Sequence, residues 1–258
     1  MYTTQIDHMN LHQIANSGQC FRWQQIDDNT YIIPAFGKEL TISQDGNTFI
    51  LSCDEEEWNS IWRNYFDLET NYNEVEHIIM ESNDDFLKAA YEFGSGIRIL
   101  RQDLWEVIIS FIISQNNNIP RIKKSIEKLC NDVGDRFPSR FELSRIDLSN
   151  KGLGYRDKYL INAVMWDLWK FADPLLILNT MENPKIELMK IKGVGNKVAD
   201  CICLFALHRL NSFPVDTHIQ RIIDREYGGE LPEWAFGKYA GLFQQYIFNF
   251  EVNFYGRK

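Results

Sequence analysis

Lys197 and Asp216 are residues of this chain whose types could do chemistry, one as an amine nucleophile and the other as a carboxylate that stabilises positive charge. Lys197 falls in the first turn of a predicted helix, directly after Lys192-Gly193-Val194-Gly195. A neutral lysine amine attacks electrophilic carbon and forms a Schiff base, and partial burial and the positive end of a helix both disfavour the ammonium form. Cys201 lies four residues further on, so we expect it to contact Lys197. The alternatives are a solvated lysine that binds phosphate and, at Asp216, an N-cap for a helix over residues 217–227.

The segment around Lys197 predicts two packed helices joined by a tight glycine turn. Apolar residues recur at helical spacing before and after the turn: Leu188, Ile191, Val198, Ile202, Leu204 and Phe205. Gly193 and Gly195 suit a turn whose backbone approaches another molecule closely. The second helix begins at this turn, where unpaired amides and the helix dipole together favour phosphate.

This segment resembles the helix-hairpin-helix plus Gly/Pro-Asp module of DNA base-excision glycosylases. The resemblance implies that Gly193, Val194 and Gly195 hold the DNA backbone and that Lys197 marks a bifunctional glycosylase/lyase. Asp216 matches the second catalytic residue of that superfamily. His218 matches a phosphate contact, which we expect Glu251 to orient.

The segment Ser17-Gly18-Gln19-Cys20-Phe21-Arg22-Trp23 narrows the resemblance. Taken alone, it favours a glycine turn that leads into a β-strand with Phe21 and Trp23 on one face. It is also similar to the SGQ-x-FRW sequence of 8-oxoguanine DNA glycosylases. In that family the carbonyl matching Gly18 accepts a hydrogen bond from N7–H of the oxidised base. Guanine carries a bare acceptor at N7 and would be repelled there.

The helix near the C-terminus carries two further matches to this family, Gln244 and Phe248. Gln244 matches the residue that bonds to the Watson–Crick edge of the base, and Phe248 matches the aromatic residue that stacks on it. With Gly18 and Cys201, these residues form the expected base-recognition set. Aromatic residues in such a helix more often belong to a core, and the base-binding role rests on the resemblance.

Three more segments imply contacts with duplex DNA. Leu100-Arg101-Gln102-Asp103 and the asparagine run before Ile119 are hallmarks of the family. Asn116 matches the residue that fills the gap left by a flipped nucleotide, and Tyr155 matches a wedge beside that gap. Arg121 and Arg156 match readers of the estranged cytosine, so we expect a preference for cytosine opposite the lesion. Gln115 stands where the best-known relatives have serine. Read alone, the asparagine run is a loop with a helix cap, and Gly152–Arg156 is a glycine-bounded loop.

The predicted fold class is α+β, mainly α. Strands are expected at 31–33, 39–42 and 48–52, with a hairpin turn at 44–47. Residues 1–82 should form a small antiparallel β-sheet domain, and residues 83–258 a helical glycosylase region with a DNA and base cleft between the two. The helical region includes the hairpin at about 182–210 and the aspartate segment at 213–219. The expected helices cover 55–66, 73–80, 121–133, 157–171 and 217–227, together with an almost wholly apolar helix that starts after Asp103. The C-terminal helix is expected to pack back toward the sheet domain.

Composition sets further bounds. The net charge is −9, but residues 185–209 hold five Lys/Arg against two Asp/Glu, which predicts a basic DNA face on an acidic body. Five scattered cysteines favour free thiols in a reducing compartment. Neither a signal peptide nor a membrane-spanning run is evident, so we expect an intracellular protein, in the cytoplasm or nucleoid of a prokaryote or the nucleus of a eukaryote.

The expected partner is double-stranded DNA that contains 8-oxoguanine opposite cytosine, bound by a monomer. No cofactor is expected to be required. Because no cysteine follows Cys203, the four-cysteine iron–sulfur loop of endonuclease-three enzymes cannot be built. The sequence does not decide whether a monovalent or divalent ion binds under the hairpin carbonyls. No other metal site is predicted.

Three alternative functions remain open at this point. Glycosylases for adenine, alkylated bases or oxidised pyrimidines share the hairpin. A non-catalytic module could use the hairpin only to hold DNA. A metal-dependent nuclease is less favoured, because no HExxH or clustered-carboxylate signature is present.

Overall fold

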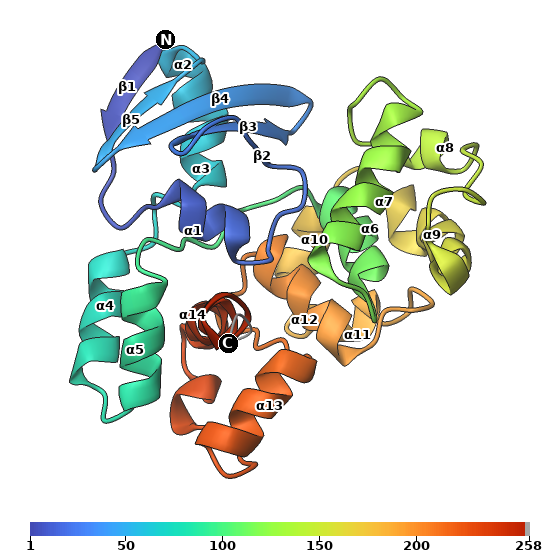
Figure 1. Cartoon of the computed structure of the whole chain (residues 1–258). Helices are drawn as coiled ribbons and strands as arrows, with labels where there is room; N and C mark the ends of the chain where they lie inside the picture. Colours follow the sequence, from blue (N-terminus) through green and yellow to red (C-terminus); the bar gives the residue numbers. More distant parts are fainter. Residues whose placement is uncertain (256–258) are drawn as a thin grey trace.

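The N-terminal part of the chain forms a five-stranded antiparallel sheet (Figure 1). The computed structural model describes residues 1–255. Alternate residues of the central strands are buried, as period-two side chains require when one face is covered. The predicted α+β class with a small N-terminal antiparallel sheet is therefore confirmed. The strands are β1 (Tyr2–Gln5), β2 (Gln24–Gln25), β3 (Thr30–Ala35), β4 (Lys38–Asp45) and β5 (Thr48–Leu51), in the order β1-β5-β4-β3-β2.

The sheet is covered on its buried face by two helical segments. One is α1 (Leu11–Asn16), and the other is a continuous helix built from α2 (Glu55–Glu57), the π-helical turn η1 (Trp58–Trp62) and α3 (Arg63–Tyr65). Trp58 and Trp62 are almost fully buried in the core that these helices share with β3, β4 and β5. The hairpin also lies where the sequence predicts it, with Asp45 paired to Thr48.

Phe21 and Trp23 do not lie on one face of a strand, so that interpretation of their segment is wrong. The strand in this region is only Gln24–Gln25. Phe21 packs edge-on against Phe111 in the helical core, whereas Trp23 packs against Tyr31 in the sheet core. The segment crosses from one core to the other, and each aromatic residue is buried on a different side.

The rest of the described chain is helical (Figure 1). Its α-helices are α4 (Tyr72–Glu81), α5 (Asp85–Phe93), α6 (Leu104–Ser114), α7 (Ile119–Asn131), α8 (Arg140–Leu143), α9 (Asp157–Val164), α10 (Pro174–Thr180), α11 (Pro184–Leu188), α12 (Asn196–Phe205), α13 (Thr217–Glu226) and α14 (Ala240–Asn253). The short 3-10 helices are η2 (Gly154–Arg156), η3 (Asp167–Lys170) and η4 (Glu233–Phe236).

The apolar helix α6 runs through the centre of this region, as its composition predicts. Asp103 caps it by accepting a hydrogen bond from the Glu106 amide at 2.9 Å. Eight of its eleven residues are buried, so nearly all of its faces contact other elements. It packs against α7, α9 and α12, and thereby supports the helix that carries Lys197.

The single helix predicted over residues 157–171 is wrong, because the chain turns after Val164. Trp166 has an extended backbone, with ψ at 132°, and separates α9 from η3. The turn buries Trp166 and Leu168 and lets the Trp166 and Trp169 rings meet edge to face. Burial of these side chains outweighs the helical pattern of the sequence.

The C-terminal helix α14 contacts α5 and α13 and also reaches the sheet side of the molecule. Asn249 donates a hydrogen bond to Gln13 at 2.9 Å, and Asn253 donates one to the Asn16 carbonyl at 3.1 Å. The predicted boundary near Ser82 stays a prediction, and α4 and α5, on either side of it, both contribute to the larger helical core.

Candidate active site

The hairpin between α11 and α12 contains two glycines. The fold requires a glycine at Gly193 but not at Gly195. Gly193 has φ +95°, and a Cβ there would lie 2.4 Å from Cγ of Tyr159. Gly195 begins α12 at an ordinary φ of −96°, and a Cβ there would meet nothing within 4 Å. Val194, between them, is buried and anchors the turn. The bare surface at Gly195 and the unpaired amides of the first turn suit a phosphate group.

Lys197 occupies the first turn of α12 and is half-buried. Its Nζ lies 5.4 Å from the centroid of the Phe111 ring, a cation–π distance. Phe111 in turn stacks on Phe205, with ring centroids 5.2 Å apart. The apolar wall of the site is therefore shared by α6 and α12, and Lys197 lies over its edge.

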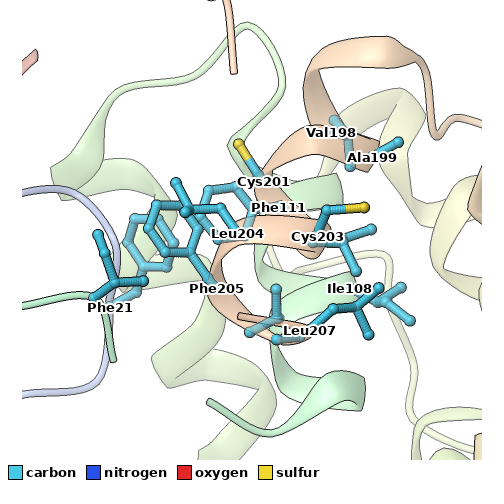
Figure 2. Close-up of a cluster of buried hydrophobic side chains, with 14 of the residues drawn as sticks. Phe21, Ile108, Phe111, Val198, Ala199, Cys201, Cys203, Leu204, Phe205 and Leu207 are labelled. Carbon is cyan, nitrogen blue, oxygen red and sulfur yellow. The ribbon is translucent and has the colours of Figure 1, made fainter. Parts of the chain in front are cut away.

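Cys201 contacts Lys197, as the spacing along the helix predicts. Burial raises the pKa of the Cys201 thiol to about 11, although the neighbouring Lys197 favours the thiolate. The residue is 3% exposed and is neutral at physiological pH. Figure 2 shows it at the edge of the buried cluster, beside Phe111. Lys197 therefore has a neutral neighbour on this side and no fixed thiolate counter-charge.

Asp216 is the N-cap of α13, as predicted. Its Oδ1 accepts hydrogen bonds from the amides of His218 and Ile219, each at 2.9 Å. The same oxygen accepts both bonds, so Oδ2 is not used in capping. Capping and a catalytic role are thus compatible in one carboxylate.

Lys197 and Asp216 lie together where a wide cleft meets a small cavity. The cleft has a volume of about 570 Å³ and is also lined by Asn116, Gly195 and His218. The cavity has a volume of about 40 Å³, and its lining residues are Gly18, Phe111, Lys197, Cys201, Phe205, Pro214, Asp216, Gln244, Gln245 and Phe248. The tertiary structure therefore brings the predicted nucleophile, the aspartate and the predicted base-recognition residues to one place.

The cavity is closed by Phe248 against Gly18. Gly18 has φ +77°, and a Cβ there would lie 2.9 Å from Cε1 of the Phe248 ring. A volume of 40 Å³ suits a water molecule and not a purine, because drug-sized ligands occupy pockets of about 300–1,000 Å³. The Phe248 ring must therefore move away from Gly18 before a base can enter between them.

Asn116 and Tyr155, both predicted to lie at the DNA gap, are hydrogen-bonded to each other. Asn116 adopts a left-handed backbone with φ +46° and donates from Nδ2 to the Tyr155 hydroxyl at 3.1 Å. Tyr155 also packs edge-on against Tyr159, the residue whose ring covers Gly193. A chain of contacts thus links the predicted wedge to the hairpin.

The two predicted cytosine readers differ in their surroundings. Arg121 is exposed in the first turn of α7. Arg156 is 6% exposed, lies over the Tyr155 ring, and donates hydrogen bonds to the carbonyls of Gln115, Asn116 and Leu153. Arg156 therefore holds the asparagine loop in shape, and its contact with cytosine stays a prediction.

Glu251 does not orient His218, so this part of the prediction is wrong. Glu251 pairs with Arg225, two helical turns beyond His218, at 2.8 Å. His218 instead meets the Phe248 ring edge to face, with centroids 5.8 Å apart. The geometry of the α13–α14 contact brings the longer arginine side chain to Glu251.

Among the residues at the site to which the sequence gave no functional role are Phe111, Tyr159 and Gln245. Phe111 and Tyr159 lie in ordinary amphipathic helices, and their spacing carries no sign of a functional role. Gln245 had a signal, because adjacent glutamines are unusual in a helix that is otherwise largely apolar and aromatic.

The basic character of the hairpin is reduced by local ion pairs. Lys185 pairs with Asp200 at 2.8 Å, and Lys190 pairs with Glu187 at 2.5 Å. The net excess of positive charge in residues 185–209 therefore resides on Lys192, Lys197 and Arg209. Two of these charges, Lys192 and Lys197, lie at the turn and the start of α12, and Arg209 lies beyond the other end of the helix.

The described residues contain neither a metal-ligand cluster nor a membrane-spanning helix. No group of three or more His, Cys, Asp or Glu side chains within residues 1–255 is arranged to hold a metal ion. Within the same residues, no helix is both long and apolar enough to cross a bilayer.

Comparison with known proteins identifies the family. Residues 1–108 match the model of the 8-oxoguanine DNA glycosylase N-terminal domain. The chain is 30% identical to the N-glycosylase/DNA lyase of Saccharomyces cerevisiae over 84% of its own length and 68% of the relative's. The chain belongs to the 8-oxoguanine DNA glycosylase family. It is an enzyme of the DNA glycosylase/AP lyase class.

Solved structures of this glycosylase family are similar over nearly the whole chain. MBOgg1 in complex with a low-affinity DNA ligand is 34% identical with a TM-score of 0.89, covering 97% of this chain and 94% of that one. The 8-oxoguanine glycosylase/lyase of Clostridium acetobutylicum, in complex with DNA containing cytosine opposite 8-oxoG, is 32% identical with a TM-score of 0.87 and covers 96% and 93%. The 3-methyladenine DNA-glycosylase of Archaeoglobus fulgidus has a TM-score of 0.78 at 19% identity, which shows a shared fold alone.

Proposed function

We propose that this enzyme excises 8-oxoguanine paired with cytosine in duplex DNA, through a Schiff base on Lys197, and then cleaves the strand by β-elimination. The observation that carries the proposal is that Lys197 and Asp216 border both the wide cleft and the small cavity. The cleft suits the DNA backbone, and the cavity would hold the extruded base once the Phe248 ring has moved away from Gly18. The Clostridium relative acts on the same lesion and was solved with cytosine opposite it.

Access to the sugar requires extrusion of the nucleotide, at a cost of a few kcal/mol. Asn116 and Tyr155, already hydrogen-bonded to each other, would fill the vacated stack. The amides at Gly195 and the side chain of His218 would hold the flanking phosphates. These contacts and stacking of the base on Phe248, worth about 1–3 kcal/mol, offset the cost of extrusion.

Recognition of the oxidised base depends on the Gly18 carbonyl. The 8-oxo form carries N7–H, which donates to a carbonyl, whereas guanine presents a lone pair at N7 and is repelled. The missing side chain at Gly18 and its left-handed backbone allow the close approach. Gln244 lies in the same cavity and would bond to the Watson–Crick edge.

The chemistry begins with neutral Lys197. The Nζ lone pair forms a bond to C1′ of the deoxyribose as the bond from C1′ to the base nitrogen breaks, and the departing base takes up a proton. Opening of the sugar ring gives the Schiff base. Loss of a proton from C2′ then expels the 3′ phosphate, and hydrolysis releases Lys197. Asp216 would stabilise the positive charge that develops on the sugar.

Two arginines would set the preference for cytosine. Arg121 is exposed and available to the opposite strand. Arg156 already donates to three carbonyls, so its guanidinium is fixed in direction before DNA arrives. These bonds use four of its five N–H groups, so one Nη1–H remains to donate to the carbonyl oxygen or the ring nitrogen of cytosine. We also propose that the enzyme acts as a monomer.

Borohydride trapping tests the proposal directly. The enzyme is incubated with duplexes that carry 8-oxoguanine opposite each of the four bases, and the Schiff base is reduced to a stable adduct. We expect most adduct opposite cytosine and none with Lys197→Gln. Lys192→Gln, a change at the same hairpin but outside the cavity, is the matched control and should weaken binding while still giving adduct. Cleavage by Lys197→Gln at the wild-type rate would refute the assignment.

A further inference from the structure

Gln245 and Gln244 form a buried amide pair in a helix that is otherwise largely aromatic and aliphatic. They are 4% and 3% exposed. Gln245 Nε2 donates to Gln244 Oε1 at 3.0 Å, and Gln244 Nε2 donates to the Pro214 carbonyl at 3.2 Å. Both residues line the cavity assigned above to the base.

This chain of bonds fixes the orientation of the Gln244 amide. An isolated glutamine can rotate its amide and present either its oxygen or its nitrogen to a ligand. Here Gln245 requires an oxygen at one end of Gln244, and the Pro214 carbonyl requires an N–H at the other. Gln244 keeps one acceptor position and one N–H for a ligand, which match the N1–H and O6 of a guanine edge.

The oxygen of Gln245 has no such partner. Gln245 Oε1 is fully enclosed, and the structure of residues 1–255 shows no hydrogen bond to it. An enclosed carbonyl oxygen without a donor is unfavourable in a folded protein, and such atoms are uncommon. The oxygen belongs to a residue that lines the cavity, next to Gln244.

We propose that Gln245 is a specificity-determining residue whose Oε1 accepts a hydrogen bond from the 2-amino group of the flipped base. Guanine-type bases carry this group next to N1–H, so Gln244 and Gln245 together would read adjacent donors on one edge. A base that lacks the amino group would leave the oxygen unpaired. The inference rests on the proposed function, because it assumes that an 8-oxopurine enters this cavity.

The test compares 8-oxoguanine with 8-oxohypoxanthine, which differs only by loss of the 2-amino group. Each is placed opposite cytosine, and excision is measured under single-turnover conditions for wild type, Gln245→Met and Gln245→Leu. The two bases pair with cytosine with different strengths, so the informative quantity is the change in their rate ratio between wild type and variant. This comparison cancels differences in duplex stability.

We expect the ratio to favour 8-oxoguanine in the wild type and to fall about tenfold in both variants, the effect of one unpaired buried polar group. Loss of 8-oxoguanine excision should account for the fall. Asn249→Leu, which removes another buried amide of α14 that pairs with Gln13, is the control and should leave the ratio unchanged.

The outcomes separate the inference from the proposed function. If both variants slow the two substrates equally, Gln245 serves only to hold Gln244 in place and the inference is wrong. An unchanged rate on both substrates would also overturn it. If the wild type excises neither base, the proposed function fails, and the inference fails with it. Thermal melting of each variant confirms that the protein compared is folded.

Discussion

The backbone of Gly18 and the ring of Phe248 meet across the candidate base cavity, although nearly the whole chain separates them in sequence. A Cβ on Gly18 would lie 2.9 Å from Cε1 of Phe248, which is closer than real Cβ atoms approach. The contact leaves a cavity of about 40 Å³, which is too small for a base. The base is predicted to bind between Gly18 and Phe248. The Phe248 ring must therefore move away from Gly18 before the base can enter.

Gly18→Ala should therefore reduce excision as well as stability. The left-handed φ of +77° should cost about 1–2 kcal/mol for alanine, and the added methyl group also blocks the cavity. We expect at least a tenfold loss of single-turnover excision. Gly37→Ala shares the backbone strain, with φ +72°, but faces open space and should lower only the melting temperature. Equal activity in both variants would show that the Gly18 contact is irrelevant to the reaction.

The two hairpin glycines should separate folding from DNA binding. Gly193→Ala places a methyl group into the Tyr159 ring at a φ of +95°, so we expect about 2–4 kcal/mol of destabilisation. Gly195→Ala meets nothing in the protein, so the melting temperature should stay unchanged while affinity for DNA falls. Unfolding curves and DNA binding across a range of salt concentrations measure the two effects. Normal DNA affinity in Gly195→Ala would argue against phosphate binding at the start of α12.

The two arginines predicted to read cytosine should behave differently when they are replaced. Arg156→Gln breaks buried hydrogen bonds to the Gln115 and Asn116 carbonyls, so we expect about 2–4 kcal/mol of destabilisation. Arg121→Gln is exposed and should leave stability unchanged, but it should narrow the difference in excision rate between cytosine and the other opposite bases. If Arg121→Gln retains the full preference, opposite-base selection lies elsewhere.

Glu106 should make stability fall as pH rises. Burial raises its pKa from 4.5 to about 7, although its ion pair with Arg22 at 2.9 Å acts in the opposite direction. A carboxyl group with a raised pKa in the folded state favours folding while it is protonated, so its contribution declines between about pH 4.5 and 7. The free energy of unfolding should fall by about 3 kcal/mol over this range, since a pKa difference of one corresponds to roughly 1.4 kcal/mol.

Urea unfolding of wild type and Glu106→Gln at pH 5 and pH 8 measures this effect. The wild type should lose stability relative to the variant at the higher pH, because glutamine cannot ionise. A parallel pH dependence in the two proteins would mean that Glu106 does not titrate in this range.

Several parts of the fold and site follow from the sequence because they depend on neighbouring residues. Asp103 and Asp216 cap helices through amides two or three residues away. The contact of Cys201 with Lys197 follows from helical spacing, and the β4–β5 turn follows from its glycine. The hairpin motif and its resemblance to a glycosylase family could also be recognised in the sequence, because the residues of that module are continuous in the chain.

Only the tertiary structure decided which distant side chains meet. Glu251 pairs with Arg225 and not with His218, and Phe21 and Trp23 enter different cores. The burial of Arg156, the closure of Phe248 on Gly18 and the unpartnered Gln245 oxygen were equally invisible in the sequence. Caps, turns and helix faces are set by interactions within a few residues. The partners of a side chain in the site depend instead on how whole helices pack, and burial of apolar surface can then override the local pattern, as it does at Trp166.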